Sequence, residues 1–174
     1  MKKVTLSVII PTYNRYKILK KILNNLSFQK NINFYFEILV CDSSSKDETP
    51  KLCKMFKKNK KFQIKYLNSK INNLSAKRNM GIKYSSSDKL IFIDDDCIPE
   101  KNFLSKYNKK LNIPQKKIFC GIVKYPLQFS KNSNYLKYRQ STHFLFVNEN
   151  KIKPENIVVM NMGIYVDKKI KNKI

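Results

Sequence analysis

Short apolar runs alternate along the chain with stretches in which apolar residues recur every three or four positions. The apolar runs predict strands at residues 4–10, 34–40, 62–66, 90–93, 118–123 and 157–160. The stretches between them predict amphipathic helices near residues 14–26, 50–56, 74–84, 99–111 and 135–146. Strands that alternate with helices of this length favour an α/β fold, in which a mostly parallel central sheet has helices on both faces.

Single residues indicate where some of these elements begin and end. Pro11 is expected to end the first strand, because proline has no N–H for the ladder. Asn14 is a candidate cap for the first helix, and Pro50 suits the first turn of the second. Gly81 weakens the helix predicted at residues 74–84, because glycine is a poor helix former.

Three polar segments directly follow predicted strands, at residues 11–15, 42–49 and 94–96. In an open parallel sheet, ligands bind beyond the carboxyl ends of the strands. If the strands are parallel, all three segments lie on the same edge, and we expect the functional site there.

The last of these segments is a cluster of three carboxylates, Asp94, Asp95 and Asp96, in a chain with only twelve acidic residues. Strand alternation predicts that Asp94 and Asp96 converge while Asp95 points away. Neighbouring carboxylates repel, and a divalent cation can compensate them. Asp96 and Asp94 are therefore candidate ligands for Mg²⁺ or Mn²⁺ that also binds a phosphate group. The structural alternative is an acidic turn before the helix that begins near Pro99.

The other two segments and the third predicted helix supply further candidates. Arg78 can donate two hydrogen bonds to phosphate or to Asp42. Asp42 can accept from a ribose or a base, and Thr12 and Tyr13 can contact a nucleoside, although each also suits a turn. The sequence has neither a G-x-x-x-x-G-K-[ST] nor a G-x-G-x-x-G motif, so phosphate charge would fall to a metal and to Arg.

Lysine dominates the charge of the chain. The 174 residues include 33 Lys, three Arg and twelve Asp or Glu, which give a formal net charge of +24. Base recognition in nucleic acids favours Arg, so we expect a generally basic surface and no nucleic-acid partner. Weak attraction to anionic lipids is compatible with this charge, because each Lys near such a surface contributes about 1 kcal/mol. The alternative is a non-catalytic basic module that binds nucleic acid or an anionic membrane with steep salt dependence.

The cysteines and apolar runs bear on localisation. Cys41, Cys53, Cys97 and Cys120 form no C-x-x-C pair, which is typical of reduced thiols in a cytosolic protein. No apolar run approaches the ~18 residues of a membrane span, and the start of the chain lacks a signal-peptide pattern. We therefore expect a cytoplasmic protein, with peripheral contact at the inner face of the membrane as a further expectation.

Five segments, in order, resemble those of family-2-like glycosyltransferases with the GT-A fold. They are S-V-I-I-P-T-Y-N-R at 7–15, E-I-L-V-C-D-S-S-S-K-D-E-T at 37–49, S-A-K-R-N-M-G-I at 75–82, F-I-D-D-D-C-I-P at 92–99 and V-M-N-M-G-I-Y-V at 159–166. The fourth is similar to the family's metal-binding D-x-D segment. The resemblance covers nearly the whole chain.

The resemblance implies a nucleoside-diphosphate sugar donor, often a UDP-sugar, and inverting transfer to a hydroxyl of a glycan or lipid-linked acceptor, as in cell-surface polysaccharide biosynthesis. A metal would stabilise the leaving diphosphate. The matching positions that would bind the nucleotide sugar are Pro11, Thr12, Tyr13, Arg15, Asp42, Arg78, Asp94 and Asp95. The metal would be held by Asp96 and Asp94.

The chain departs from the family pattern in two places. The loop after the second strand often has D-D-G-S, whereas this chain has Asp42 followed by three serines. We expect one domain over residues 1–174, with a nucleotide-sugar-binding half at 1–125 and an incomplete acceptor-side half at 126–174. The general base is expected beyond Ile174, and Asp167 is a weak candidate that also suits a helix start. A non-catalytic truncated remnant is the alternative.

Overall fold

The computed structural model describes residues 3–112, 118–121, 123–124, 133–135, 137 and 161–174. Its strands are β1 (Leu6–Thr12), β2 (Phe36–Asp42), β3 (Phe62–Asn68), β4 (Lys89–Ile93), β5 (Ile118–Cys120) and β6 (Asn161–Tyr165). Its helices are α1 (Tyr16–Ser27), α2 (Thr49–Phe56), α3 (Leu74–Tyr84), α4 (Phe103–Leu111) and α7 (Lys168–Lys171). The strand predicted at residues 157–160 and most of the helix predicted at 135–146 lie outside the described residues.

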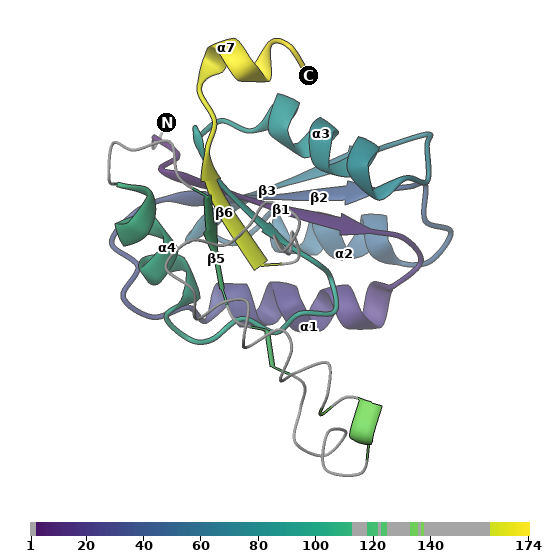
Figure 1. Cartoon of the computed structure of the whole chain (residues 1–174). Helices are drawn as coiled ribbons and strands as arrows, with labels where there is room; N and C mark the ends of the chain where they lie inside the picture. The colour runs from purple at the N-terminus through teal and green to yellow at the C-terminus, as the bar shows by residue number, and fades with distance from the viewer. Residues whose placement is uncertain (1–2, 113–117, 122, 125–132, 136, 138–160) are drawn as a thin grey trace.

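The strands form one mixed sheet in the order β3-β2-β1-β4-β6-β5 (Figure 1). The pairs β1–β2, β2–β3 and β1–β4 are parallel, whereas β6 is antiparallel to both of its neighbours. The mostly parallel sheet predicted from the alternation is therefore confirmed, with one reversed strand inserted near an edge.

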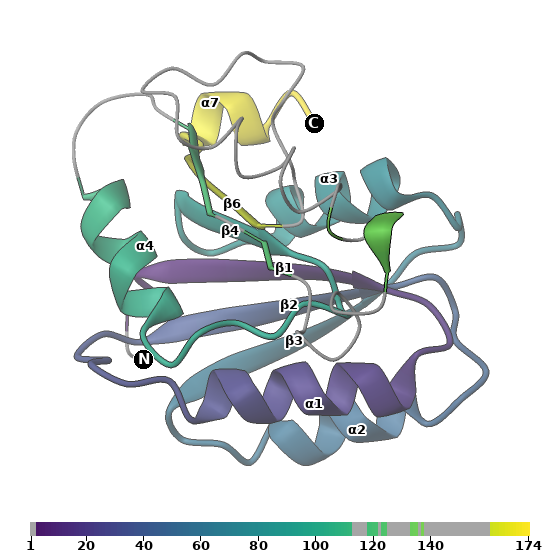
Figure 2. The same cartoon turned by 60° about the horizontal axis from the view of Figure 1, so that its bottom comes forward.

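Helices cover both faces of the sheet (Figure 2). Strand alternation sends Val8 and Ile10 of β1 into the larger apolar cluster, which they share with residues of α1, α2 and α4. Ile9 points to the other face, where a second cluster includes Met80 and Ile82 of α3. β1 and β2 are buried along their whole length, as expected of central parallel strands.

Several predicted boundaries are wrong: the helix predicted from residue 99 begins at Phe103, the strand predicted at 118–123 ends at Cys120, and two further errors lie beside the polar segments. β1 continues through Pro11 to Thr12, because its pairing with β4 stops at Ile9 and only the pairing with β2 extends further. Asn14 does not cap α1: it has a positive φ of 51°, and its Oδ1 accepts a hydrogen bond from the backbone N–H of Lys46. The N–H of Tyr16, the first residue of α1, instead donates to Asp47 from the neighbouring loop at 2.8 Å.

Gly81 allows α3 to lie directly against the sheet. A Cβ atom at this position would be 2.4 Å from Cγ2 of Ile9 and 3.2 Å from Sγ of Cys41. The glycine weakens the helix locally, but it brings α3 close to β1 and β2.

The predicted division into two halves stays a prediction, since the boundary at residue 125 lies outside the described residues. Within the part of the chain that the structure describes, no helix is both long and apolar enough to cross a membrane.

Candidate active site

The three polar segments lie at one edge of the sheet. The arrowheads of β1, β2 and β3 point to the same side in Figure 2. In the β1–β2 register, Thr12 lies opposite Asp42. The acidic turn of residues 94–96 follows β4, which runs parallel to β1. The shared edge expected from the sequence is therefore present.

Asp95 is the buried member of the acidic turn. Its Oδ2 accepts a hydrogen bond from Oγ1 of Thr12 at 2.7 Å, and its Oδ1 accepts from Nη1 of Arg15 at 2.9 Å. Burial raises the pKa of the Asp95 carboxyl above its ordinary value, while the bonds from Thr12 and Arg15 act in the opposite direction. These contacts link the ends of β1 and β4.

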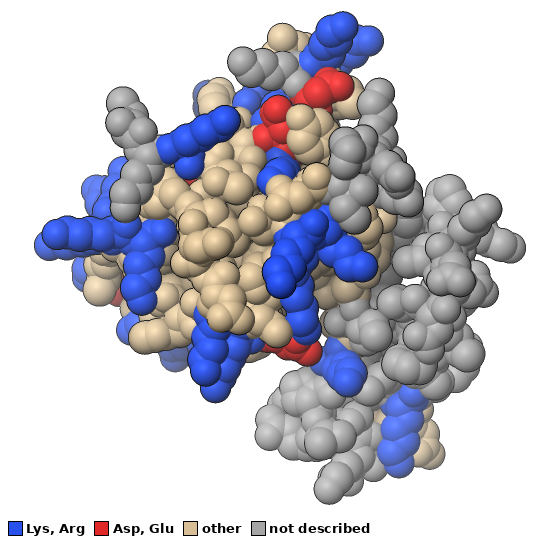
Figure 3. Space-filling model, turned by 90° about the vertical axis from the view of Figure 1, so that its left-hand side faces the viewer, with Lys and Arg blue, Asp and Glu red and all other residues tan. Residues whose placement is uncertain are grey.

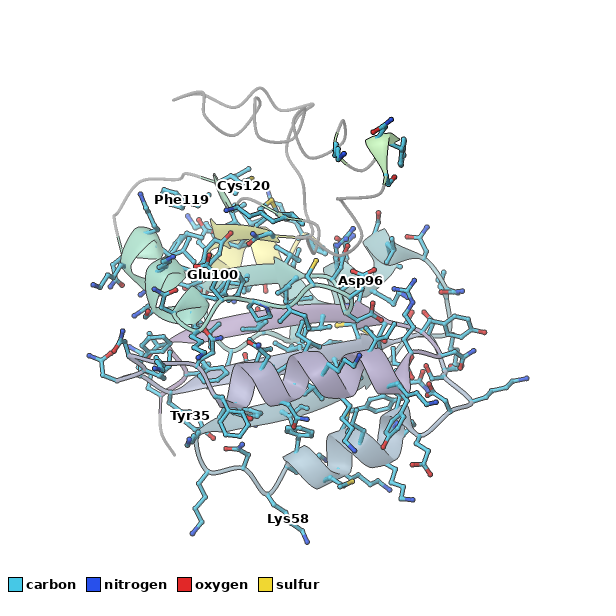
Figure 4. The ribbon with its side chains drawn as sticks, turned by 90° about the horizontal axis from the view of Figure 1, so that it is seen from below. Tyr35, Lys58, Asp96, Glu100, Phe119 and Cys120 are labelled. Carbon is cyan, nitrogen blue, oxygen red and sulfur yellow. The ribbon has the colours of Figure 1, made fainter. Side chains whose placement is uncertain are left out.

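The three aspartates do not point in the predicted directions, in which Asp94 and Asp96 would converge and Asp95 would point away. Asp94 is paired with Nη2 of Arg78 at 2.8 Å, whereas Asp95 and Asp96 share Nη1 of Arg15, which lies 3.3 Å from Oδ2 of Asp96. The prediction fails because β4 ends at Ile93, so strand alternation does not extend into the turn. Asp96 remains the most exposed of the three, with 56% of its side chain accessible (Figure 4).

Asp42 is fully buried and engaged by its own neighbours. Its carboxylate accepts hydrogen bonds from Tyr66 Oη at 2.7 Å, from the N–H of Ser45 at 2.9 Å and from Oγ of Ser45 at 2.5 Å. Burial, followed by the bond to Asp42, raises the pKa of the Tyr66 hydroxyl. Ser45 is one of the three serines that follow Asp42, where the resembling pattern often has a second aspartate. Its two hydrogen bonds hold Asp42 in place.

Lys77 joins the site, although it was not a candidate from the sequence. Its side chain is buried, and its Nζ donates to the carbonyl oxygen of Thr12 at 3.1 Å. Burial lowers the pKa of the Lys77 ammonium, while the charges of Asp42 and Asp95 raise it. A signal was present, because Lys77 precedes Gly81 by one helical turn and so lies on the face that contacts the sheet.

The remaining candidates occupy different positions. Pro11 is buried within β1, and Tyr13, the next residue after the strand, is 40% exposed. Asp167 lies away from the acidic turn: β6 is antiparallel to β4, so its end at Tyr165 pairs with Lys89 at the start of β4. Asp167 directly precedes α7 and accepts a hydrogen bond from the N–H of Ile170, so it lies at a helix start as the alternative interpretation predicted.

The acidic turn can be tested for its fit to a divalent cation. Among the described residues, no three His, Cys, Asp or Glu side chains lie close enough together to enclose a metal ion. Mg²⁺ and Mn²⁺, however, often bind one or two protein carboxylates together with water and substrate phosphates. The exposed Asp96 and the half-buried Asp94 supply that kind of partial oxygen set, so the residues fit a metal that arrives with a phosphate ligand.

Comparison with a known family decides the classification. Residues 7–170 match the model of glycosyl transferase family 2. The chain belongs to this family. The match includes every polar segment of the candidate site, and the family resemblance identified from the sequence is confirmed.

Two similar proteins each match part of the chain. The chain is 32% identical over 126 residues to a chondroitin synthase of Pasteurella multocida, an alignment that covers 71% of this chain and 13% of the synthase. It is 33% identical over 100 residues to the glycosyltransferase AglE of Haloferax volcanii, covering 58% of this chain and 33% of AglE. The chain thus spans a third or less of the length of these relatives.

Solved structures confirm the GT-A fold class. Residues 1–349 of Staphylococcus aureus TarS superpose with a TM-score of 0.59 at 25% identity, covering 66% of this chain and 34% of that structure. TarS has also been solved in complex with UDP and with UDP-GlcNAc. The mannosyltransferase PcManGT of Pyrobaculum calidifontis, in complex with GDP-Man and Mn²⁺, gives a TM-score of 0.61 at 22% identity, covering 72% of this chain and 37% of that structure.

Proposed function

We propose that this family member binds a nucleoside-diphosphate sugar at the carboxyl edge of the sheet and transfers the sugar to an acceptor hydroxyl with inversion. One observation carries the proposal: two of the chain's three arginines, Arg15 and Arg78, meet the acidic turn at this edge. Arginine recognises phosphate with two parallel hydrogen bonds, and the nearby carboxylates suit a metal that bridges phosphates.

The contacts suggest a role for each residue. Thr12, Tyr13 and Asp42 border the position of the nucleoside, with Asp42 setting the shape of its loop through Ser45. Lys77 fixes the carboxyl end of β1 through its hydrogen bond to the carbonyl oxygen of Thr12. These groups orient the nucleotide before the sugar reacts, and an oriented donor removes much of the entropic barrier to transfer.

Asp96 and Asp94 are the residues that would hold Mg²⁺ or Mn²⁺. When bound, the metal supplies Lewis-acid stabilisation of the charge that develops on the leaving diphosphate. Arg78 is only 18% exposed and lies beside Asp94, so it keeps a fixed positive charge near the same group. We assign no described residue to the removal of the acceptor's proton.

The proposed donor is a UDP-sugar. The support is the likeness to TarS, which has been solved with UDP and with UDP-GlcNAc. For the acceptor we propose a glycan or lipid-linked hydroxyl. For the location we propose the cytoplasm, in accord with the thiols of Cys41, Cys53 and Cys97, none of which forms a disulfide.

Thermal denaturation tests the proposal directly. UDP plus Mn²⁺ should raise the Tm, since a ligand at a hundredfold excess over its dissociation constant stabilises by about 2.7 kcal/mol. Asp96→Asn should remove the part of the shift that depends on Mn²⁺. Glu100→Gln is the matched control, because Glu100 is an exposed acid outside the turn and should leave the shift unchanged. Folded wild-type protein that responds to no nucleoside diphosphate, with or without metal, contradicts the proposal.

A further inference from the structure

One layer of the molecule, formed by α1, α2 and the residues that follow α2, is unusually basic. Residues 16–27 and 49–61 contain no Asp or Glu, and about one residue in three is Lys, compared with about one in five over the whole chain. All nine lysines of this layer are exposed: Lys17, Lys20, Lys21, Lys51, Lys54, Lys57, Lys58, Lys60 and Lys61. We call this the α1–α2 layer.

The two helices lie side by side on the same face of the sheet (Figures 2 and 4). α1 is amphipathic: with the helical period of 3.6 residues, Leu19, Ile22 and Leu23 lie on its buried face, and the intervening lysines lie on the face exposed to solvent. Lys58, just beyond α2, extends outward in Figure 4. The layer therefore presents its charge to the surroundings rather than to the protein interior.

Little of this charge is neutralised within the protein. Of the nine lysines, only Lys51 has an ion pair within the part of the chain that the structure describes, with Glu48 at 3.2 Å. Lys20 lies 5.9 Å from the ring centre of Tyr16, a contact that leaves its charge in place. An anionic surface would meet a nearly uniform positive field here.

Apolar side chains stand among these lysines. Met55 is 60% exposed and lies one helical turn from both Lys51 and Lys58. Ile18 is 38% exposed on α1, and Phe28, directly after α1, is 74% exposed. Exposed apolar groups surrounded by Lys are typical of protein surfaces that lie at the headgroup level of a bilayer.

We propose that the α1–α2 layer docks on a lipid bilayer that contains anionic phospholipids. The charge complements the headgroups, and the exposed apolar side chains can enter the boundary with the acyl chains. The layer contains no Arg, the residue that most often recognises bases through paired hydrogen bonds, which favours a lipid surface over a nucleic acid. The docking goes beyond the proposed transfer reaction and does not depend on it.

The position of the layer connects docking with the candidate site. α1 begins at Tyr16, next to Arg15, so the layer reaches the edge of the sheet that carries the acidic turn. A bilayer beneath α1 would adjoin the site, where a lipid-linked acceptor could reach it. This consequence, unlike the docking itself, rests on the proposed function.

Co-sedimentation with vesicles tests the docking, and a charge-matched variant controls it. Figure 3 shows that lysines also occur on the side of the molecule that carries α4. The experiment must therefore distinguish the effect of total charge from the effect of where the charge lies. The layer variant carries the substitutions Lys54→Gln, Lys57→Gln, Lys58→Gln and Lys61→Gln. The control removes the same charge from exposed residues before and within α4: Lys101→Gln, Lys106→Gln, Lys109→Gln and Lys110→Gln.

We expect wild-type protein to bind vesicles of phosphatidylcholine with phosphatidylglycerol and not vesicles of phosphatidylcholine alone. The layer variant should bind at least roughly tenfold more weakly, and the control within about threefold of wild type. Equal losses in both variants, or wild-type protein that does not bind the anionic vesicles, would overturn the proposal. The proposal would also be overturned if wild-type protein bound a DNA duplex but no vesicles, and if the layer variant lost that DNA binding. Matching melting curves verify that each variant is folded.

Discussion

Nη1 of Arg15 lies 2.9 Å from Oδ1 of Asp95, and the same nitrogen lies 3.3 Å from Oδ2 of Asp96. One guanidinium thus bridges two neighbouring carboxylates of the acidic turn. A metal that binds Asp96 must compete with this cation, because both require the same negative oxygens. We therefore expect Arg15 to lower the affinity of the proposed metal site in the absence of a nucleotide.

The first prediction concerns that competition. Arg15→Gln should bind Mn²⁺ about two- to fivefold more tightly than wild type without nucleotide, a modest change because the ion pair to Asp96 is exposed. Electron paramagnetic resonance of free Mn²⁺ measures the affinity directly. Arg15→Lys, which keeps the charge, should stay near wild type. Unchanged or weaker Mn²⁺ binding by Arg15→Gln would show that Arg15 does not compete.

The second prediction concerns the stability of the turn. Burial raises the pKa of Asp95, so the folded chain holds this proton more strongly than the unfolded chain does. Above that raised pKa, the ionised carboxyl therefore reduces stability. Asp95→Asn should raise the Tm at pH 7, because Thr12 can still donate to the amide oxygen.

The gain should shrink as the pH falls through the raised pKa, since the wild-type carboxyl then becomes protonated. Scanning fluorimetry from about pH 7 to pH 4 measures the difference in Tm between the two proteins. Asp96→Asn is the control and should show no such gain, because Asp96 is exposed. A gain of the same size at every pH would exclude titration of Asp95 as its cause.

A third prediction concerns Glu37, a buried carboxylate near the start of β2. It accepts hydrogen bonds from Oγ of Ser7 at 2.6 Å and from the N–H of Ser86 at 2.5 Å, and it pairs with Lys65 at 2.8 Å. Glu37→Ala should lower the free energy of unfolding by about 3 kcal/mol, because it leaves these donors and a partly buried charge without their acceptor.

Urea denaturation compares this variant with Glu48→Ala. Glu48 pairs with Lys51 at the surface, where removal of one partner should change stability by less than about 1 kcal/mol. UDP binding should survive in the folded fraction of Glu37→Ala, because Glu37 lies at the edge of the sheet opposite the acidic turn. Equal effects of the two substitutions would contradict the role given to burial.

Local patterns predicted the elements that depend on local sequence. The bounds of α3 agree with the prediction at residues 74–84, and the apolar run of β4 ends where the aspartates begin. Parallel strands bring loops to a common edge, so the positions of Thr12, Asp42 and the acidic turn also followed from the sequence.

The missed features depend on tertiary contacts. Lys77 acquires its place because α3 packs on β1, and nothing within its own helix indicates the partner carbonyl of Thr12. The directions of the aspartates depend on two arginines that lie 16 and 80 or more positions away in the chain. The cap of α1 comes from Asp47 in another loop, which a search of adjacent residues could not find.

The last prediction is that replacing Gly81 by alanine destabilises the protein, although the same change inside a helix is usually stabilising. Replacing a glycine inside a helix by alanine normally stabilises by about 1 kcal/mol. Here the new methyl group would lie 2.4 Å from Cγ2 of Ile9, a fully buried side chain in the interface between α3 and the sheet. Overpacking of this kind costs about 1–3 kcal/mol, so Gly81→Ala should lower stability on balance. α3 would also shift away from β1, taking Lys77 and Arg78 with it.

Urea denaturation and UDP titration together separate these two effects. Ser75→Ala is the matched control, because Ser75 is exposed in the first turn of the same helix and its replacement should leave stability and UDP binding near wild type. Gly81→Ala should lose both stability and affinity, since Arg78 reaches Asp94 only while α3 lies close to the sheet. If Gly81→Ala is more stable than wild type, the close contact with Ile9 does not determine the position of α3.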